Sequence, residues 1–575
     1  MPDSLRDRNR ERRAQERFLF APSGGGDVSV CLVYPNTYPV GMANLGFQSV
    51  FEILSRHPRV RCERAFLPDA DQRGSEVVSF ESGKRLRDFE IVAFSISFET
   101  DYLHVVDILA GAGVLPLREE RRGGGPLLLC GGPATFLNPE PIADFFDAFF
   151  VGEGEEMIPE LLAQFVAARD AGMGRDGVLD AIAEVGGAYR PDRYTVAYAA
   201  DGTIASVAYR GPGSGVVTRR LVADLDRFTT ASKVLAPEAV FGDMYLVEAS
   251  RGCEWGCRFC AAGYMYRPIR HRSVGALAAA IDEGLAHRST IGLVGAEMAS
   301  VPGVASLCER VAAAGGRASP SSLKADVLTQ RLARALGRSA NQSVTVAPEA
   351  GSERLRRVIN KNLTEPEILR AADWLVGAGV RAMKLYFMIG LPTEAPEDVE
   401  AIVELSRKIG ERFRREGRVQ QIKLSVNPFG PKPWTPFQWE PMEDLRALKV
   451  KIGGLRRAVG RLRGVDIDVE SPREAYWATV LSRGDRRVSR LLLAIHAAGG
   501  DWWSVLRAWE REPPEGGVDP RLFSHRAYAA DEILPWDVLD HHLHKRFLWV
   551  ERERARAERQ TMPCDVTTCR VCGAC

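Results

Sequence analysis

Short apolar runs alternate with longer amphipathic stretches between residues 27 and 170 of the chain. The apolar runs are typical of buried strands, and stretches with an apolar residue at every third or fourth position are typical of helices. This alternation predicts a doubly wound parallel sheet, whose ligands lie beyond the carboxyl ends of the strands. The predicted strands are VSVCLVYP (28–35), FEIVAFSIS (89–97), PLLLCGGP (126–133) and AFFV (148–151).

A second alternation of apolar runs and helical stretches extends from residue 243 to about 470. Six such runs match a partial (β/α)6 barrel, whose chemistry belongs at the carboxyl ends of its strands. Between the two units, YTVAYAADGTIASVAY predicts a hairpin around Asp201 and Gly202. The predicted barrel strands are MYLVEAS (244–250), STIGLVGAE (289–297), SSLKADV (321–327), SVTVAPEA (343–350), AMKLYFMIG (382–390) and QQIKLSVNPF (420–429).

The composition excludes several classes of protein. Of the 575 residues, 45% are hydrophobic and 26% are charged, which is ordinary for a globular chain. Lys and Arg (76) nearly cancel Asp and Glu (75), so a net charge of +1 gives no general reason to expect nucleic acid or an anionic membrane as partner. No apolar run approaches the roughly 18–20 residues that span a bilayer. The N-terminus lacks the apolar core of a secretory signal, so we expect a cytoplasmic protein.

Seven of the eleven cysteines fall in two tight clusters, at 253–260 and 564–575. A reducing cytosol favours clustered cysteines as metal ligands rather than disulfides. The segment RGCEWGCRFC follows the strand MYLVEAS and spaces Cys253, Cys257 and Cys260 as C-x3-C-x2-C. Three thiolates leave one iron of a four-iron cluster without a protein ligand, and an open position is what a catalytic metal site keeps. A structural zinc site or a ferredoxin-like cluster would need a fourth ligand, and no nearby Cys or suitable His supplies one.

This motif, with Phe259 just before its last cysteine, resembles the signature of the radical S-adenosylmethionine (SAM) superfamily. The resemblance implies a [4Fe–4S] cluster on the three cysteines, with the amino and carboxylate groups of SAM on the open iron. It also implies reductive cleavage of SAM to methionine and a 5′-deoxyadenosyl radical, which abstracts hydrogen from the substrate. A reductant of the flavodoxin or ferredoxin type is then the expected electron donor.

Further segments resemble the SAM-binding elements of that superfamily, in the same order. GAE (295–297) resembles the motif that meets the ammonium of SAM, where a carboxylate suits a fixed cation. APEAGSERLRRVINKN (347–362) resembles the fourth-strand motif near the ribose, and MIGLPTE (388–394) resembles the element beside the adenine, although Phe387 replaces its first glycine. NPFGPKPWTPFQW (427–439) resembles a segment of methylthiotransferases and cobalamin-linked members. Turn glycines and helix-start carboxylates are the structural alternative for each segment alone. The implied SAM contacts are Phe259, Gly295, Glu297, Glu349, Ser352, Ile389 and Gly390.

The loop after the first predicted strand keeps the spacing of a cobalamin motif but lacks its ligand. Cobalamin proteins with a histidine below the cobalt carry D-x-H-x-x-G, and here the loop reads N-x-Y-x-x-G, with Asn36, Tyr38 and Gly41. The resemblance to cobalamin-linked radical SAM enzymes therefore implies cobalamin without a histidine from this loop. The alternative is a sheet without a ligand that only caps the barrel. Glycine permits close backbone approach to a bulky cofactor, and the expected contacts in the other loops are Ser95, Ser97, Gly131, Gly132, Gly152 and Gly154.

The chain ends in CDVTTCRVCGAC, which resembles ferredoxin spacing but also suits tetrahedral zinc. A second iron–sulfur cluster and a zinc ion both remain open, as do disulfides or a free tail. No RNA-binding β-barrel of the methylthiotransferase kind is evident after residue 470, which weakens an RNA-directed reading. The candidate ligands are Cys564, Cys569, Cys572 and Cys575.

The domain order, the hairpin and RGCEWGCRFCAAGYMYRPIRHRS together resemble radical SAM proteins with a cobalamin-binding domain. We therefore expect an α/β protein with an N-terminal doubly wound parallel sheet, a partial (β/α)6 radical SAM barrel and a helical C-terminal extension. The expected segments are a charged tail that is a solvated helix or frayed (1–25), a cobalamin-binding-like Rossmann domain (26–185), a hairpin linker (186–240), the barrel (241–470), a helical region (471–562) and a Cys-rich metal tail (563–575).

Three functions follow from these patterns. The first is cobalamin-dependent transfer of a methyl group to an unactivated carbon. The second is a cobalamin-independent radical SAM reaction, methylthiolation or rearrangement, on a substrate that could include RNA or protein. The third, a non-catalytic iron–sulfur scaffold or electron-transfer protein, is disfavoured because an electron carrier needs no pocket for adenosine. The sequence does not identify the substrate.

Overall fold

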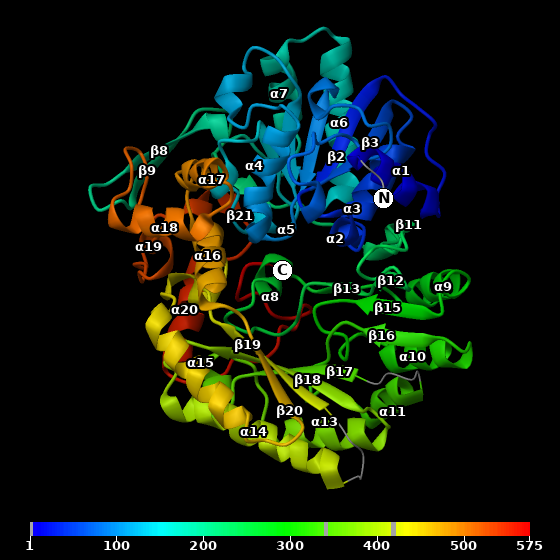
Figure 1. Cartoon of the computed structure of the whole chain (residues 1–575), viewed down its shortest axis with the longest axis vertical. Helices are drawn as coiled ribbons and strands as arrows, with labels where there is room; N and C mark the ends of the chain where they lie inside the picture. The colour runs from blue at the N-terminus through cyan, green and yellow to red at the C-terminus, as the bar shows by residue number, and fades with distance from the viewer. Residues whose placement is uncertain (1–3, 339–342, 416–420, 575) are drawn as a thin grey trace.

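The chain forms two α/β units with a helical C-terminal region beside both. The computed structural model describes residues 4–338, 343–415 and 421–574. In Figure 1 the N-terminal unit, blue to cyan, lies above the second unit, green to yellow. The orange helices α16 (Pro472–Arg483), α17 (Val488–Ala497) and α18 (Trp502–Arg511) run along one side of both units (Figure 1). No helix in the described part of the chain is long and apolar enough to cross a bilayer.

The N-terminal unit is a mostly parallel sheet with helices on both faces. Its strands are β2 (Val28–Tyr34), β3 (Val60–Phe66), β4 (Ile91–Ser95), β5 (Leu127–Gly131), β6 (Ala148–Phe150) and β7 (Ala188–Tyr189). Their order is β3-β2-β4-β5-β6-β7, and β7 alone in this sheet runs antiparallel to its neighbour. Every residue of β2 is buried, as expected for a strand covered on both faces. The helices are α2 (Tyr38–Gly41), α3 (Leu45–Arg56), α4 (Tyr102–Gly111), α5 (Pro133–Leu137), α6 (Gly154–Asp170) and α7 (Arg175–Ala183).

The second unit is built from two parallel sheets that continue one another. The first holds β12 (Met244–Glu248), β15 (Thr290–Val294) and β16 (Arg317–Pro320). The second holds β17 (Ser343–Glu349), β18 (Ala382–Ile389), β19 (Gln421–Pro428) and β20 (Val465–Val469). A single parallel bridge between Leu323 and Val346 joins the two. The predicted α/β class, with a parallel sheet followed by a partial barrel and a helical region, is confirmed.

The third barrel strand lies earlier than predicted. SSLKADV was expected to form it, but β16 ends at Pro320 and residues 321–327 follow as a loop. Leu323 and Ala325 are buried there, and Leu323 makes only the isolated bridge to Val346, so the apolar pattern indicated burial rather than a continuous strand. Gln420, which the prediction for the sixth strand included, lies outside the described residues. The helices around the barrel are α8 (Ala262–Met265), α9 (Val274–Leu285), α10 (Val304–Ala313), α11 (Gln330–Arg338), α12 (Glu353–Val358), α13 (Glu365–Gly377), α14 (Pro396–Arg415) and α15 (Leu445–Val459).

Short pairings tie distant parts of the chain together. The linker forms the hairpin of β8 (Tyr194–Tyr198) and β9 (Ile204–Tyr209). It then supplies β10 (Val217–Thr218), which pairs with β21 (Leu539–Asp540) of the C-terminal region. The other such elements are β1 (Arg17–Phe18) paired with β11 (Val234–Leu235), β13 (Ser250–Arg251) paired with β14 (Arg270–His271), and the helices α19 (Arg521–Ser524) and α20 (Lys545–Arg556).

The charged N-terminal segment is neither frayed nor fully solvated. It forms α1 (Leu5–Gln15), which Ser4 caps by accepting a hydrogen bond from the Asp7 amide. Arg12 is buried and its guanidinium lies 2.8 Å from Asp69 of the N-terminal unit. The alternating charges therefore form specific ion pairs across a domain surface, which sequence alone cannot distinguish from a solvated face.

Candidate functional site

The three cysteines of the C-x3-C-x2-C motif lie in one loop at the end of the first barrel strand. β13 leads directly into Gly252, whose φ of 86° is in the left-handed region that favours glycine. A Cβ at this position would lie 2.6 Å from the carbonyl oxygen of Tyr266, so the turn excludes other residues. The loop then carries Cys253, Cys257 and Cys260 and ends at α8.

The electrostatics of the thiols favour a bound cationic centre. Burial raises the pKa of Cys253 to about 12 and the pKa of Cys257 to about 11. The mutual repulsion of the thiolates raises both pKa values further, whereas Lys361 and Lys324 oppose the rise at Cys257. Iron held between the sulfurs would supply the missing positive charge. The donor set therefore fits the iron–sulfur cluster that the motif implies.

A buried arginine inside the motif anchors this loop to the end of the chain. Arg258 is fully buried, and its backbone amide donates to the carbonyl of Ile359 at 3.0 Å. Its Nε and Nη2 donate to Glu551 of α20 at 3.2 and 3.1 Å. Nη1 and Nη2 also donate to the carbonyls of Val358 and Arg559, at 2.8 and 2.7 Å. Because the guanidinium satisfies several carbonyls and one carboxylate at once, it fixes the loop between α12 and α20.

Two lysines flank the cluster loop. Lys324 is buried, and its ammonium lies 3.7 Å from the ring centre of Trp255, between the first two cysteines. Lys361 donates to Glu349 at 3.3 Å, and its charge, like that of Lys324, lowers the pKa of Cys257. A cation over an aromatic face is a favourable contact that also orients the ring. The loop is thus held by positive side chains that compensate the charge of the thiolates.

A cavity of about 360 Å³ lies beside the cluster loop at the carboxyl ends of β17, β18 and β19. Phe259 of the cysteine motif and Glu349 of the fourth-strand motif, two of the residues predicted to contact SAM, both line it. Glu349 has a φ of 66° at an irregularity of the β17–β18 pairing, which turns the chain at the strand end. Other lining residues are Tyr386, Met388, Asn427, Phe429, Lys432 and Glu470.

Other predicted SAM contacts have structural partners. The carboxylate of Glu297 accepts hydrogen bonds from the amides of Ala299 and Ser300, both at 2.7 Å, and of Lys324 at 3.1 Å. Ser352 caps α12 by accepting from the Leu355 amide at 3.0 Å and donates to Asp398. Neither residue lines either of these two cavities, and the expected contacts of Glu297 with the SAM ammonium and of Ser352 with the ribose stay predictions.

The fifth-strand element is held by its own glutamate. Gly390 has a φ of 78°, and its amide donates to Glu394 at 2.9 Å. Glu394 also accepts from Lys451 at 2.6 Å, and Ile389 is fully buried. The motif therefore shapes the turn after β18, and Gly390 and Ile389 are not among the residues that line this cavity.

A larger cavity, of about 500 Å³, extends from the N-terminal sheet to the cluster loop. Its inner part lies between the sheet and the helices α3 and α6, and its walls there are mostly apolar. Its outer part reaches Gly252 at the start of the cluster loop, Ala262 at the start of α8 and Gly295 after the second barrel strand. The residues predicted for this ligand site from the strand-end loops all line it, namely Ser95, Ser97, Gly131, Gly132, Gly152 and Gly154.

Two of these positions require glycine because a neighbouring backbone segment lies too close for a side chain. A Cβ at Gly132 would lie 2.4 Å from the carbonyl oxygen of Ile96, and a Cβ at Gly152 would lie 2.3 Å from that of Arg220. At Gly131 the nearest atom would be 3.5 Å away, so that position has room for a side chain. Glycine here mostly permits close packing of loops, which in turn forms the cavity rim.

The loop expected below a cobalt ion points elsewhere, which corrects the prediction for Asn36, Tyr38 and Gly41. Tyr38 is buried in the core, where its ring stacks on Phe80 at 5.1 Å and its hydroxyl donates to Glu16 at 2.9 Å. Asn36 donates to Asp101 at 2.8 Å, and none of the three motif positions lines the cavity. Asn44, Leu45 and Gly46 at the start of α3 form the cavity wall instead.

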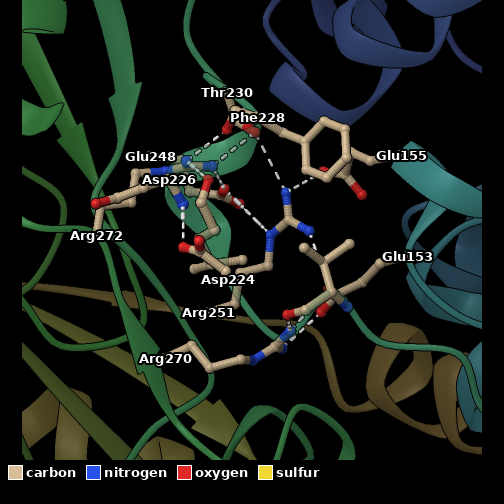
Figure 2. A network of polar contacts seen from close by, with 12 residues as sticks. Glu153, Glu155, Asp224, Asp226, Phe228, Thr230, Glu248, Arg251, Arg270 and Arg272 are labelled. Atoms are coloured by element: carbon tan, nitrogen blue, oxygen red, sulfur yellow. Dashed lines mark hydrogen bonds and ion pairs between the residues drawn. The ribbon is translucent and has the colours of Figure 1, made fainter.

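A network of arginines and carboxylates closes the cavity where the two units meet, and sequence reasoning missed it. Figure 2 shows Arg251 between Glu153 and Glu155 of the N-terminal unit and Glu248 of β12. Arg270 donates to Glu153 at 2.6 and 2.8 Å, and Arg272 donates to Glu248 at 2.7 Å. The sequence signal was the arginine that directly precedes the cysteine motif, followed by the basic run RPIRHR.

The C-terminal cysteines lie against the cluster loop. The amide of Cys564 donates to the carbonyl of Glu254 at 2.8 Å, and the Cys572 carbonyl accepts from the His544 amide at 2.9 Å. In Figure 1 the red end of the chain accordingly runs to the middle of the molecule, near α8. Among the described residues, no group of three or more His, Cys, Asp or Glu side chains is positioned to hold a single metal ion, and this holds for Cys253, Cys257 and Cys260 as well as for the C-terminal cysteines. A four-iron cluster differs from a single ion because each thiolate binds a different iron. Cys575, the fourth predicted ligand, lies outside the described residues.

The fold and the cysteine loop together define a radical SAM protein. Residues 247–406 match the model of the radical SAM superfamily, and residues 46–191 match the model of the N-terminal region of radical SAM proteins. The chain belongs to the radical SAM superfamily and carries this N-terminal domain. The family implies the [4Fe–4S] cluster and SAM.

Particular relatives are distant. An uncharacterized protein of Methanocaldococcus jannaschii is 29% identical over 469 residues, which cover 81% of this chain and 90% of that protein. Among solved structures, the cobalamin-dependent SAM radical enzyme OxsB with aqua-cobalamin and SAM bound is 12% identical, with a TM-score of 0.48 over 92% of this chain and 79% of that one. The radical SAM methyltransferase TsrM from Kitasatospora setae, with cobalamin and a [4Fe–4S] cluster bound, is 13% identical, with a TM-score of 0.45 over 72% of this chain and 74% of that one. At these scores the two likenesses carry no argument about this chain.

Proposed function

We propose that this radical SAM enzyme uses cobalamin to transfer a methyl group to an unactivated carbon. The observation that carries the proposal is the cavity of about 500 Å³ that opens from the N-terminal sheet onto the cluster loop. Its volume is within the range of about 300–1,000 Å³ typical of cofactor pockets. It also lies at the carboxyl ends of parallel strands, where α/β sheets bind nucleotide-like ligands.

The residues of the cavity suit the two parts of such a ligand. Ile53, Leu54, Leu161 and Leu162 line its inner part, and their side chains suit an apolar heterocycle. The Ser95 side of the rim offers hydroxyl and backbone groups for the amides of a large ring. No histidine is among the residues that line this cavity in the described part of the chain, so a cobalt ion bound there would receive no imidazole from its walls.

The second cavity is the proposed site of the SAM nucleoside. It adjoins Phe259 of the cysteine loop, and its polar lining residues include Glu349, Asn427 and Lys432. When bound, the cluster supplies the electron that cleaves SAM and cobalamin supplies the methyl group. The chain contributes thiolates on one loop and the positive charges of Lys324 and Lys361 beside them.

The test is the retention of hydroxocobalamin by anaerobically purified, cluster-reconstituted protein after desalting. We expect the wild-type protein to retain it and, after one-electron reduction of the bound Co(III) with a chemical reductant, to give a Co(II) paramagnetic resonance spectrum without nitrogen splitting. Ala93→Phe projects a ring from β4 into the cavity and should abolish retention, because Ala93 lines its wall. Ala110→Phe makes the same change at an exposed position of α4 and should retain cobalamin like the wild type.

Product analysis separates the proposal from its alternative. SAM that gives up a methyl group leaves S-adenosylhomocysteine, whereas reductive cleavage leaves methionine and 5′-deoxyadenosine. Formation of S-adenosylhomocysteine should depend on hydroxocobalamin and disappear in Ala93→Phe. Reductive cleavage without any bound cobalamin would favour the cobalamin-independent reaction and an N-terminal sheet that only covers the barrel.

A further inference from the structure

Arg251 lies both at the start of the cluster loop and in the wall of the large cavity. It is the last residue of β13, two residues before the first cysteine of the motif, and its side chain is 11% exposed. The same side chain forms part of the wall of the large cavity. A change in its position therefore acts on the cluster loop and on the cavity together.

Its guanidinium makes contacts on both sides of the boundary between the units. Towards the N-terminal unit it lies 3.1 Å from Glu153 and pairs with Glu155 in the first turn of α6. Towards the barrel its Nε donates to Glu248 at 3.0 Å, and its Nη2 donates to Thr230 at 3.2 Å (Figure 2). All of these partners line the cavity.

The carboxylates differ in how strongly they depend on Arg251. Glu153 is also held by both Nη atoms of Arg270, and Glu248 is also held by Arg272. For Glu155, Arg251 is the one cationic partner among the described residues. The position of Glu155, in the first turn of α6, therefore depends on the position of Arg251 at the start of the cluster loop.

We infer that Arg251 is the positioning residue through which the cluster loop and the N-terminal cavity order one another. A planar guanidinium can bridge carboxylates on two units at once, which the point charge of a lysine cannot. If filling the cysteine loop fixes Arg251, it also fixes Glu155 and the start of α6. By linkage, a ligand that orders the cavity stabilises the filled cysteine loop by the same free energy. The inference rests on the proposed function only for the identity of that ligand.

The experiment compares hydrogen exchange at residues 152–158 of the full chain before and after cluster reconstitution. In the wild type, reconstitution should slow exchange at these residues by roughly fivefold or more, the lower end of common coupling strengths. Glu155→Gln and Arg251→Lys should remove this difference while cluster content stays at the wild-type level. A purely structural role would speed exchange equally in both forms and leave their ratio unchanged.

The matched control is the ion pair of the next residue on α6, Glu156. Glu156 pairs with Arg227, whose side chain is 59% exposed, and Glu156 does not line the cavity. Glu156→Gln should keep the cluster-dependent difference of the wild type. If Arg251→Lys does not take up iron, Glu155→Gln, which alters no residue of the loop, decides the question.

Two results would overturn the inference: an exchange ratio near one in the wild type, or a wild-type ratio in Glu155→Gln. The affinity for hydroxocobalamin, measured with and without the cluster, then tests whether cobalamin is the ligand that is linked to the cysteine loop. Affinity that rises with the cluster in the wild type but not in Glu155→Gln supports the linkage. Failure to bind hydroxocobalamin in either form defeats the proposed function, and the exchange result still decides the role of Arg251.

Discussion

Replacing Glu551 by glutamine tests whether the C-terminal helix α20 holds the cluster loop in place. Both Arg258 and Glu551 have side chains that are almost completely buried, at 0% and 2% exposure. Glutamine keeps the shape of the side chain but removes the negative charge. Arg258 keeps the carbonyls of Val358 and Arg559 as acceptors and loses its charge partner.

The expected cost follows from burial. Removing one partner of a buried pair costs about 3–5 kcal/mol, because the remaining charge is uncompensated. The carbonyls that still accept from Arg258 place the expected value near the lower end, about 3 kcal/mol. Since each 1.4 kcal/mol is a factor of ten, the open state of the loop should become roughly 100-fold more populated.

Hydrogen exchange of residues 253–261 in the cluster-free protein measures this opening locally, which avoids treating a multidomain chain as two-state. Faster loss of iron to a chelator should accompany it in the reconstituted protein. Asp282→Asn is the control, because Asp282 and Arg310 form an exposed pair, at 48% and 51%, and should change neither measurement. Wild-type exchange in Glu551→Gln would refute the reasoning, since the pair would then contribute nothing to the loop.

The remaining predictions concern the metal centres and pH. Replacing Cys253, Cys257 and Cys260 together by alanine should abolish reductive formation of 5′-deoxyadenosine, and undiminished turnover would contradict the cluster assignment. Deleting residues 564–575 should remove a second metal centre and leave the barrel cluster; metal analysis before and after identifies iron or zinc, and unchanged content of both means that these cysteines hold no metal. Burial, reinforced by a nearby arginine, lowers the pKa of His541 to about 3, below the 6.5 of an unfolded chain. The unfolded chain therefore binds the extra proton between these values, so this contribution to stability is complete above pH 6.5 and decreases as the pH falls, by about 1.4 kcal/mol at pH 5.5. His541→Gln should lose this part of the pH dependence in denaturation experiments at pH 7.5 and 5.5, and an identical pH dependence in both proteins would count against it.

Where function resides in contiguous residues, the sequence was a good guide. The cysteine spacing, the buried strand β2 and the loop positions Ser97 and Gly131 follow from local pattern and from parallel topology. Parallel strands bring their carboxyl ends to one edge, so residues that follow different strands must meet. The existence of a cavity there was therefore predictable.

Features that depend on packing between distant segments were not predictable. Tyr38 has the right spacing for a ligand loop, but its orientation is decided by Glu16 and Phe80, which come from other elements. Ser352 caps its own helix, which is a local role, but its hydroxyl also donates to Asp398 of α14, and only this second contact depends on a distant segment. The partners of Arg251 come from separate segments, and no local pattern relates them.

The contact between Arg258 and Glu551 has a consequence for the order of events during protein synthesis. The two residues are 293 positions apart in the chain. At a synthesis rate of 5–20 residues per second, roughly 15 to 60 s separate the emergence of the cysteine loop from that of its anchor. During this interval the cysteines are already made but their loop has no α20 to hold it. A cluster loaded during this interval would therefore meet a loop that still lacks the contacts of Arg258 with Glu551 and Arg559.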